Sequence, residues 1–473
     1  MQHVDLAFTG SSTPRRSLPS AIFLGCLMVG ALTACGKHEE SAQQAPPPAA
    51  AATTASAPAA TAISDADIGD AYLYLLGRLL VLRQEHLDFR DNGFKWNEVI
   101  HHEPGGVAWA NPNLDVAYSE AWIGIDEHSC TIVEVPKIEG RYYTIQTLNG
   151  WGETTANINE RNYPQHPYGK FAFCLKDAQV DLPADTQRID LPSRKSRSLM
   201  RVELGKDPKQ AVALQHQIKL YATGKPEIAP AVDIPIFAND KLPGAEAFDT
   251  AKAVLDSEPD INPGMDGIRH KVDESISLTA SDRDRVQKAI ETVAWPKFKA
   301  SFSKLGTEKN GWNRPSTIGK YGDDWMTRTL VNFAGIWANS NDEAVYFKTD
   351  SDGTGTKLDG GTTYTMTFPK GDLPSSHAKY FWSVIAVDSK DFRVIPNPKN
   401  RFLLNKESKL QYGKDGSLTL YFGSDKPAGA PDGNWLPTPK GQNYNLTWRS
   451  YGPDDATVSG AWYPAPLVKQ GGG

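Results

Sequence analysis

The chain has 473 residues, of which 40% are hydrophobic, and its 50 basic and 56 acidic side chains give a formal net charge of −6. The chain is acidic and has no lysine- or arginine-rich stripe that could bind phosphate backbones. We therefore do not expect a nucleic acid as a partner. The length exceeds what a single hydrophobic core supports and therefore predicts two domains.

The N-terminus has the layout of an export signal. Arg15 and Arg16 precede an apolar stretch over residues 18–32, which has the length of a signal-peptide core and is too short to cross a bilayer. The arginine pair leaves open whether export follows the twin-arginine route or the general secretory route. We expect residues 1–34 to be a signal peptide and the folded part to lie outside the cytoplasm.

The signal ends in Leu32-Thr-Ala-Cys35, which resembles the lipobox of bacterial lipoproteins. The resemblance implies that Cys35 becomes the first residue of the mature chain and carries acyl chains, such as palmitate, that anchor it to the lipid bilayer. Gly36 stands where an aspartate usually marks retention in the inner membrane, so the outer membrane of a bacterial cell envelope is the favoured location. The alternative is an ordinary secretory signal with an incidental cysteine.

Residues 35–60 consist largely of Ala, Pro, Thr, Ser and Gln. Such a segment buries too little surface to offset its ordering entropy, which predicts a disordered tether. In the folded region only Cys130 and Cys174 remain, because Cys26 leaves with the signal. In an oxidising compartment this pair predicts a disulfide, the alternative being two buried thiols, and its spacing does not suit a zinc site.

An N-terminal β domain with a leading helix is expected over residues 61–204. Ser64 is suited to cap a helix, and apolar residues recur at three- and four-residue steps from 65 to 87. Short runs rich in β-branched and aromatic residues, separated by Gly, Pro and Asn, are typical of antiparallel strands. They span residues 116–125, 130–135, 141–147 and 170–175.

Residues 205–311 are expected to form a helical bridge and residues 312–473 a C-terminal β domain. Helical composition interrupted by prolines characterises three bridge segments: 207–221, 247–257 and 282–305. Apolar and polar residues then alternate over 363–368, 418–422 and 444–449. The sequence thus predicts a mainly β fold with a helical bridge (α+β), made of two antiparallel β-sandwich or jelly-roll-like domains.

Two sets of motifs fall in the two β-rich regions. The first set consists of Asn113-Leu-Asp-Val-Ala-Tyr118, Arg141-Tyr-Tyr143 and Gln146. The second set consists of Leu358-Asp-Gly360, Phe381-Trp-Ser383, Asn400-Arg-Phe402 and Asn434-Trp-Leu-Pro437. The first set resembles the bacterial domain of unknown function 1254, and the second resembles the domain of unknown function 1214 that usually follows it. The resemblance implies two β-rich domains with a helical bridge and brings no assigned reaction.

The sequence holds no nucleophile elbow, zinc-protease motif, P-loop or dinucleotide fingerprint, so neither a cofactor nor a metal is expected. A candidate ligand or catalytic cluster gathers polar and aromatic residues on neighbouring strands: Asn113, Asp115, Tyr118, Arg141, Tyr143 and Gln146. Aspartate and arginine beside tyrosines suit a polar substrate, or acid–base chemistry if burial shifts their pKa values. A buried Arg–Asp pair that only locks the sandwich has the same pattern.

A second candidate cluster lies toward the C-terminus and comprises Arg328, Asn339, Asn397, Arg401 and Asn434. Its Asn-Pro and Asn-Trp-Leu-Pro settings are also typical of turns. Tryptophans such as Trp122, Trp382 and Trp448 are expected in the core, whereas an exposed row of aromatic rings would indicate stacking on sugars.

These observations lead to three hypotheses. The first is an envelope lipoprotein that binds a small polar molecule or a saccharide in a cleft of its β domains. The second is a periplasmic hydrolase or lyase that uses Asp115, Tyr118 and Arg141. The third is a non-catalytic module that assembles as a homo-oligomer or with another envelope protein. A deep cleft favours the first two, and a large exposed apolar patch favours assembly.

Overall fold

The computed structural model describes residues 63–106, 111–302, 304–390 and 392–471. The expected signal peptide (1–34), the lipidation site Cys35 and the tether up to residue 60 lie outside the described residues. The chain from Ile63 onward packs as one unit. Within the described ranges, every helix is too short or too polar to cross a membrane.

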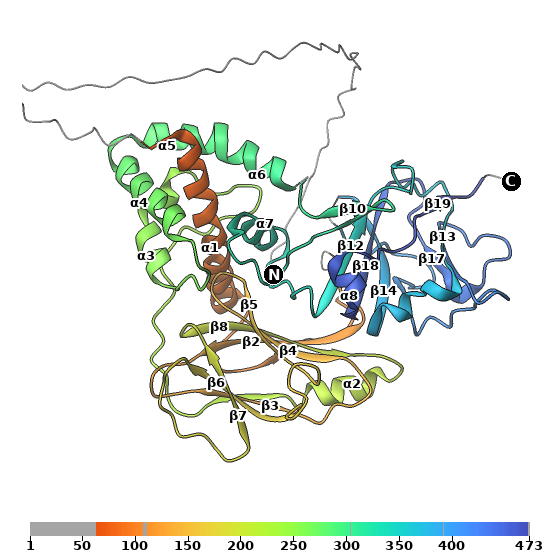
Figure 1. Cartoon of the computed structure of the whole chain (residues 1–473), viewed down its shortest axis with the longest axis horizontal. Coiled ribbons are helices and arrows are strands. Elements are labelled where there is room, and N and C mark those ends of the chain that lie inside the picture. Colours follow the sequence, from red (N-terminus) through yellow and green to blue (C-terminus); the bar gives the residue numbers. More distant parts are fainter. Residues whose placement is uncertain (1–62, 107–110, 303, 391, 472–473) are drawn as a thin grey trace, which may run out of the picture. The chain divides into compact units, whose positions relative to one another are not determined.

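The N-terminal β domain is a sandwich of two sheets (Figure 1). The first has the order β1 (Ile100–His101), β2 (Val116–Gly124), β8 (Lys195–Glu203), β4 (Tyr143–Leu148), β5 (Thr154–Ile158). The second has the order β7 (Thr186–Leu191), β6 (Gly169–Leu175), β3 (Thr131–Val135), β9 (Lys219–Ala222). Because side chains alternate along each strand, the facing apolar ones form a single core that includes Ile123, Val133, Ile145, Phe171 and Met200.

The sandwich continues beyond residue 204, where the sequence places its end. The helix α2 (Pro208–Gln215) and the strand β9 follow β8, and β9 pairs antiparallel with β3. The sequence predicts helical structure as far as residue 221, but the helix ends at Gln215. Residues 219–222 instead form β9, whose Leu220 packs in the sandwich core.

A disulfide joins Cys130 to Cys174 at one end of the β3–β6 pair. Thr131 lies opposite Phe173 in this antiparallel ladder, so the residue before β3 and the residue near the end of β6 come together. Both cysteines are fully buried and pack with Ile132 and Ala172. The disulfide therefore lies on the outer face of the second sheet, opposite the sandwich core.

α1 (Asp65–Asp91) is the central element of a helical layer. It begins at Ser64, whose hydroxyl accepts a hydrogen bond from the Asp67 amide, and two aspartates favour the positive end of the helix dipole. Most of its residues are buried because other helices pack around it (Figure 1). These are α3 (Ala251–Asp256), α4 (Asp266–Ser281), α5 (Arg283–Ala289), α6 (Trp295–Phe302) and α7 (Trp325–Gly335).

The C-terminal β domain also consists of two sheets around one core. The larger has the order β10 (Thr307–Lys309), β11 (Trp312–Arg314), β12 (Ala344–Thr349), β18 (Tyr444–Pro453), β14 (Ala378–Asp388), β15 (Leu403–Asn405). The smaller has the order β17 (Trp435–Pro437), β16 (Leu418–Gly423), β13 (Tyr364–Phe368), β19 (Val468–Lys469), and α8 (Asp455–Ser459) follows β18. The shared core includes Phe347, Met366, Leu420 and Trp448. The predicted fold class, two antiparallel-dominated β domains with a helical bridge, is confirmed.

Candidate functional site

The candidate site is built on the face of β8 that points away from the sandwich core. Met200 and Val202 enter that core, so Arg201 between them points to the opposite side. Arg201 lies opposite Tyr118 on β2 and opposite Thr144 on β4, which places it in the middle of its sheet. Strand pairing therefore fixes the position of this guanidinium.

Arg201 is a buried cation, with 3% of its surface exposed. Its Nη1 donates a hydrogen bond to Gln146 Oε1 at 2.7 Å, and its Cζ lies 5.3 Å from the centre of the Tyr118 ring. Its Nε has no hydrogen-bond partner, and no carboxylate pairs with it among the described residues. The positive charge of Arg201 is thus surrounded by the neutral amide of Gln146 and by tyrosine rings.

Arg197, four residues earlier on the same strand, is a buried cation whose charge is balanced by carboxylates. Its Nη2 lies 3.3 Å from Asp88 Oδ2 and 3.1 Å from Glu120 Oε2. Its guanidinium also lies over the ring of Phe94 at 4.3 Å. The same face of β8 thus carries one buried arginine with two carboxylates and one with none.

The C-terminal domain contributes Tyr346 from β12 and Tyr451 from β18. Their hydroxyl oxygens are 3.4 Å apart, and Asn113 Nδ2 donates to Tyr451 Oη at 2.8 Å. Asn339 Nδ2 donates to Tyr142 Oη at 3.5 Å. We name Tyr118, Tyr142, Arg201, Tyr346 and Tyr451 the tyrosine–arginine cluster, because all four tyrosines lie within electrostatic range of Arg201.

The phenols of this cluster are neutral hydrogen-bonding groups. Burial raises the pKa of Tyr142, Tyr346 and Tyr451, since the charged form is disfavoured away from water. An asparagine amide donates to the oxygen of Tyr142 and of Tyr451. The Tyr142 hydroxyl is also hydrogen-bonded to the Glu343 carboxylate, and the hydroxyls of Tyr346 and Tyr451 share one hydrogen bond. The cluster therefore combines one cation with several donors.

The structure divides the first sequence-predicted cluster. Tyr118 and Gln146 contact Arg201, and Asn113 contacts Tyr451. Asp115 is buried nearby, where it accepts a hydrogen bond from Asn405 Nδ2 at 2.8 Å. Burial raises the pKa of Asp115, and its Oδ2 has no partner.

Arg141 and Tyr143, also predicted in that cluster, lie elsewhere. Arg141 Nη1 donates to the Glu203 carbonyl oxygen at 2.8 Å and Nη2 to Gln210 Oε1 at 2.6 Å, so it holds α2 against the sheet. Tyr143 points into the sandwich core and donates to the Pro167 carbonyl oxygen. Because β4 alternates, Tyr143 faces the core while Gln146, three residues later, faces the cluster.

Of the second predicted cluster, only Asn339 reaches the tyrosine–arginine cluster. Asn397 closes its own loop by donating to the Arg401 carbonyl oxygen at 2.8 Å. Arg401 pairs with Asp432 at 2.6 Å, and Asn434 bonds both backbone groups of Gln411. These three side chains hold turns of the C-terminal domain.

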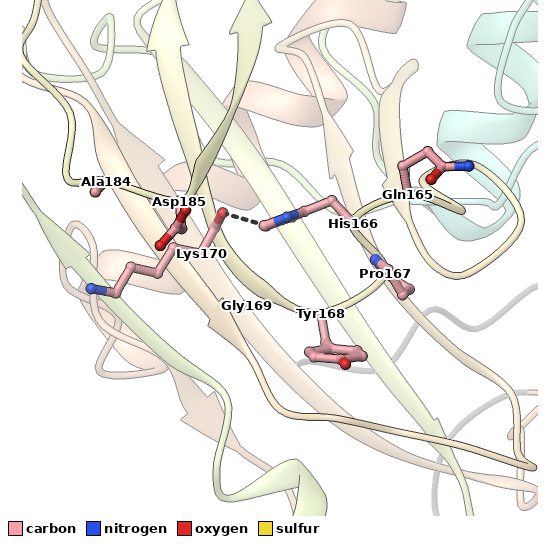
Figure 2. A pocket seen from close by; sticks show the side chains of 8 residues that line it. All are labelled: Gln165, His166, Pro167, Tyr168, Gly169, Lys170, Ala184 and Asp185. Carbon is pink, nitrogen blue, oxygen red and sulfur yellow. Dashed lines mark hydrogen bonds between the residues drawn. The ribbon is translucent and has the colours of Figure 1, made fainter.

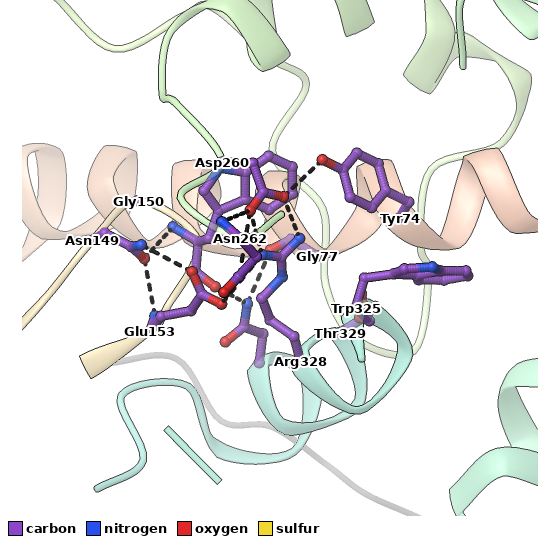
Figure 3. A network of polar contacts seen from close by, with 12 residues as sticks. Tyr74, Gly77, Asn149, Gly150, Glu153, Asp260, Asn262, Trp325, Arg328 and Thr329 are labelled. Atoms are coloured by element: carbon purple, nitrogen blue, oxygen red, sulfur yellow. Dashed lines mark hydrogen bonds and ion pairs between the residues drawn. The ribbon is translucent and has the colours of Figure 1, made fainter. Parts of the chain in front are cut away.

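Arg328 belongs to a separate buried network between α1, α7 and the β4–β5 turn (Figure 3). Its Nη1 and Nη2 donate to Asp260 at 3.1 and 2.8 Å, and Nη1 lies 3.3 Å from Glu153 Oε1. Tyr74 donates to Asp260, and Asn262 donates to Glu153. Although burial alone raises the pKa of Asp260, its bond to Arg328 lowers it. Each charge here has partners, which suits a structural role.

Two shallow depressions lie on the N-terminal domain, and neither is lined by a predicted site residue. The first, of about 430 Å³, is lined by residues 165–170 with Ala184 and Asp185 (Figure 2). The second, of about 420 Å³, is lined by residues 134–136, 169–170, 216–217 and Lys219. Among the described residues, no three His, Cys, Asp or Glu side chains are grouped to hold a metal ion.

Sequence reasoning missed Arg201, Tyr346 and Tyr451. The strand that carries Arg201 reads Lys-Ser-Arg-Ser-Leu-Met-Arg-Val-Glu, and its four charged residues hide the alternation that marks a strand. Tyr346 stands between the buried Val345 and Phe347, a pattern that could have marked it as facing away from the core. Only the pairing of strands brings the three together.

Comparisons with known proteins agree with this two-domain layout. The crystal structure of the VPA0106 protein from Vibrio parahaemolyticus is similar with a TM-score of 0.63 and 21% identity, over 86% of this chain and 100% of that chain. A putative uncharacterized protein from Burkholderia cenocepacia has a TM-score of 0.43 and 12% identity, over 86% of this chain and 95% of that one. No curated protein matches the chain. At 21% identity, the likeness to the Vibrio parahaemolyticus protein concerns the fold alone.

Family comparison covers both β domains. Residues 96–222 match the family described as protein of unknown function (DUF1254), and residues 343–455 match the family described as protein of unknown function (DUF1214). Both matches fall where the sequence motifs stand, and they occur in the expected order along the chain. The chain therefore contains one region that matches DUF1254, followed by one region that matches DUF1214.

Proposed function

We propose that this protein binds a small organic anion, of the carboxylate class, at the tyrosine–arginine cluster between its two β domains. The observation that supports the proposal is the buried guanidinium of Arg201 without a carboxylate partner among the described residues. Arginine does not lose its proton in proteins, and an unpaired buried charge costs several kcal/mol. A bound carboxylate would offset that cost.

The surroundings of Arg201 suit an anion. The neutral phenols of Tyr346 and Tyr451 are donors that a carboxylate oxygen can accept from. Tyr118 and Tyr346 are half-buried, so each of these two side chains keeps part of its surface in contact with solvent. A second carboxylate-binding feature is the shape of guanidinium itself, which presents paired N–H groups to both oxygens.

The two other hypotheses have less support. The hydrolase or lyase hypothesis needs Asp115, Tyr118 and Arg141 together, and Arg141 instead contacts α2 and the end of β8. The assembly hypothesis calls for a broad apolar patch. Large apolar side chains exposed among the described residues are few: Tyr168, Tyr221, Ile236, Ile261, Tyr412 and Val468.

Binding is tested by isothermal titration of the purified protein with a panel of aliphatic, hydroxy and aromatic carboxylates. At least one should bind, and Arg201→Met should weaken that binding by about 30-fold or more, as for loss of one partner of a buried charge pair. Arg201→Lys keeps the charge but loses the planar fork and should weaken it less.

Arg188→Gln is the matched control, because Arg188 lies half-buried on β7 and pairs with Asp190. Its affinity should equal that of the unmodified protein. Failure of every carboxylate to bind, or equal binding by the Arg201→Met variant, would overturn the proposal.

We also propose that the protein is anchored to the cell envelope through acyl chains on Cys35. Support comes from the lipobox-like sequence and from the buried Cys130–Cys174 disulfide, since disulfides persist in oxidising compartments outside the cytoplasm. Metabolic labelling with palmitate should label the protein, and Cys35→Ser should abolish both the label and recovery in the membrane fraction. Labelling that survives this substitution would contradict the anchor.

A further inference from the structure

A row of polar side chains crosses the outer face of the second N-terminal sheet. Lys170 on β6 lies opposite Thr186 on β7 and Glu134 on β3, and Glu134 lies opposite Lys219 on β9. Directly opposed residues point to the same side of a sheet. Val133 and Val135, which flank Glu134, enter the sandwich core, so the row faces outward.

The two shallow depressions meet at this row. The first contains His166, Tyr168 and Asp185, the second contains Glu134, His216 and Lys219, and both are lined by Gly169 and Lys170. Because they have two lining residues in common, they adjoin each other, and we call the two depressions together the groove. Farther along the same outer face, Val180 and Leu182 cover the disulfide and its neighbours.

The segment that carries Tyr168 is held in place from both sides. His166 Nε2 lies 3.1 Å from the Lys170 carbonyl oxygen (Figure 2). From the sandwich core, Tyr143 donates a hydrogen bond to the Pro167 carbonyl oxygen. The Tyr168 ring nevertheless stays 42% exposed. The groove therefore presents a partly exposed ring whose backbone is fixed before any ligand arrives. Lys137 Nζ lies 5.9 Å from the centre of this ring.

A second exposed ring stands beside the groove. Tyr221, two residues beyond Lys219 on β9 and 39% exposed, donates to Glu134 Oε1 at 2.9 Å. The described chain has three tyrosines among its exposed large apolar side chains, and two of them, Tyr168 and Tyr221, flank this groove. Aromatic exposure is thus concentrated here.

The charges along the groove balance. Lys170 and Lys219 are matched by Glu134 and Asp185, and the adjacent Lys137 pairs with Glu139 at 2.9 Å. A balanced set of donors and acceptors suits hydroxyl groups, which both donate and accept, better than it suits a net charge. An exposed ring between such groups can pack against the apolar C–H face of a sugar.

We propose that this groove binds a neutral linear oligosaccharide, with one sugar ring stacked on Tyr168 and its hydroxyls bonded by Lys170, Glu134 and Lys219. The site lies on the outer sheet and uses no residue of the tyrosine–arginine cluster. It is therefore independent of the anion-binding proposal, and either site can fail without the other.

The test titrates the purified protein with hexasaccharides of three neutral series, namely β-1,4-glucose, α-1,4-glucose and N-acetylglucosamine, and with oligogalacturonate as the charged comparison. At least one neutral series should bind with millimolar or tighter affinity. Tyr168→Ala should weaken that binding at least tenfold, and Lys170→Ala should weaken it as well. Raising the salt concentration should change the affinity little, because the groove carries no net charge.

Tyr412→Ala is the matched control, since Tyr412 is 52% exposed and lies in the C-terminal domain. It should bind as the unmodified protein does, and so should Arg201→Met. Absence of binding by all three neutral series would overturn the proposal, as would equal binding by Tyr168→Ala. Binding by oligogalacturonate alone, lost at high salt, would show a site for charged saccharides and would also overturn it.

Discussion

Arg197 and Arg201 have the same side-chain type, the same strand and similar burial, and they differ in their partners. Two carboxylates pair with Arg197, whereas Arg201 bonds a glutamine among tyrosines. Replacing Arg197 would leave the buried carboxylates of Asp88 and Glu120 without their cation, whereas replacing Arg201 would leave no carboxylate unpaired. Their contributions to stability should therefore differ in sign.

We expect Arg197→Met to lower the free energy of unfolding by about 3–5 kcal/mol and Arg201→Met to leave it unchanged or raise it by about 1–4 kcal/mol. Urea unfolding of both variants beside the unmodified protein measures the difference. A large loss in the Arg201→Met variant would mean that this arginine serves the fold, which would remove the main support for the anion site.

Asp115 should make stability depend on pH. Its pKa is raised by burial, so over an interval above the unfolded value of about 4 the folded protein holds a proton that the unfolded chain has lost. This contribution is complete below the unfolded pKa and is lost as pH rises through the folded pKa. Asp115→Asn should remove it.

The free energy of unfolding of the Asp115→Asn variant should rise relative to that of the unmodified protein as pH increases from 4 to 8. Asp260→Asn is the control of opposite sign, because its pKa is lowered by Arg328 despite burial, and its penalty should be largest above pH 4. Parallel urea titrations at each pH give both curves. A difference for Asp115→Asn that does not vary with pH would show that this carboxyl titrates normally.

At the scale of elements, the disulfide closes a long loop of the N-terminal β domain. Cys130 and Cys174 are 44 residues apart, for which the chain-entropy estimate is about 4 kcal/mol. Cys130→Ser and Cys174→Ser should each lower the free energy of unfolding by a similar amount, because either breaks the same bond. Unequal losses, or no effect of a reductant on unfolding, would show that the bond contributes little.

The contact between α1 and α7 depends on a glycine. A Cβ at Gly77 would lie 2.6 Å from Thr329 Oγ1, which donates to the Leu73 carbonyl oxygen. Gly77→Ala should cost about 1–3 kcal/mol through overpacking, although alanine is the better helix former. Adding Thr329→Ala should recover part of the loss. Gly267→Ala in α4, where a Cβ meets nothing within 4 Å, should not destabilise.

Strands and helices could be predicted where their side chains separate by polarity. Tyr364, Met366 and Phe368 alternate with threonines, and all three are buried as expected. β8 and α7 were not predicted, because both carry buried arginines, Arg201 and Arg328, that break the apolar period. These buried arginines have partners in distant segments of the chain, and a search for local periodicity does not detect such partners.

For the whole molecule, two domains could be predicted from length and motifs, but their junction could not. Arg201 and Tyr451 are 250 residues apart, and neither belongs to a local motif for a site. The predicted cluster grouped Tyr118 and Gln146 with Arg141, whereas the structure places both beside Arg201 and places Arg141 against α2. Proximity across a junction depends on packing that only the structure provides.

The helical layer ties the two halves of the chain together. α7 follows the first strands of the C-terminal domain, yet Asn332 on it donates to the Gly77 and Trp151 carbonyl oxygens of the N-terminal half. A fragment ending at residue 318 lacks α7 and should aggregate or lose its near-ultraviolet circular dichroism. One ending at residue 340 should retain more of both. Equal behaviour of the two fragments, measured by size-exclusion chromatography and dichroism, would contradict this role of α7.

The tyrosine–arginine cluster also limits how the two domains can be exchanged between proteins. Tyr118, Tyr142 and Arg201 come from the first β domain, while Tyr346 and Tyr451 come from the second. A gene that encoded either domain alone would encode half a cluster, and a chimaera that joined domains from two distant relatives would bring together faces that never co-evolved. Both domains must be present in one chain for the complete cluster to form.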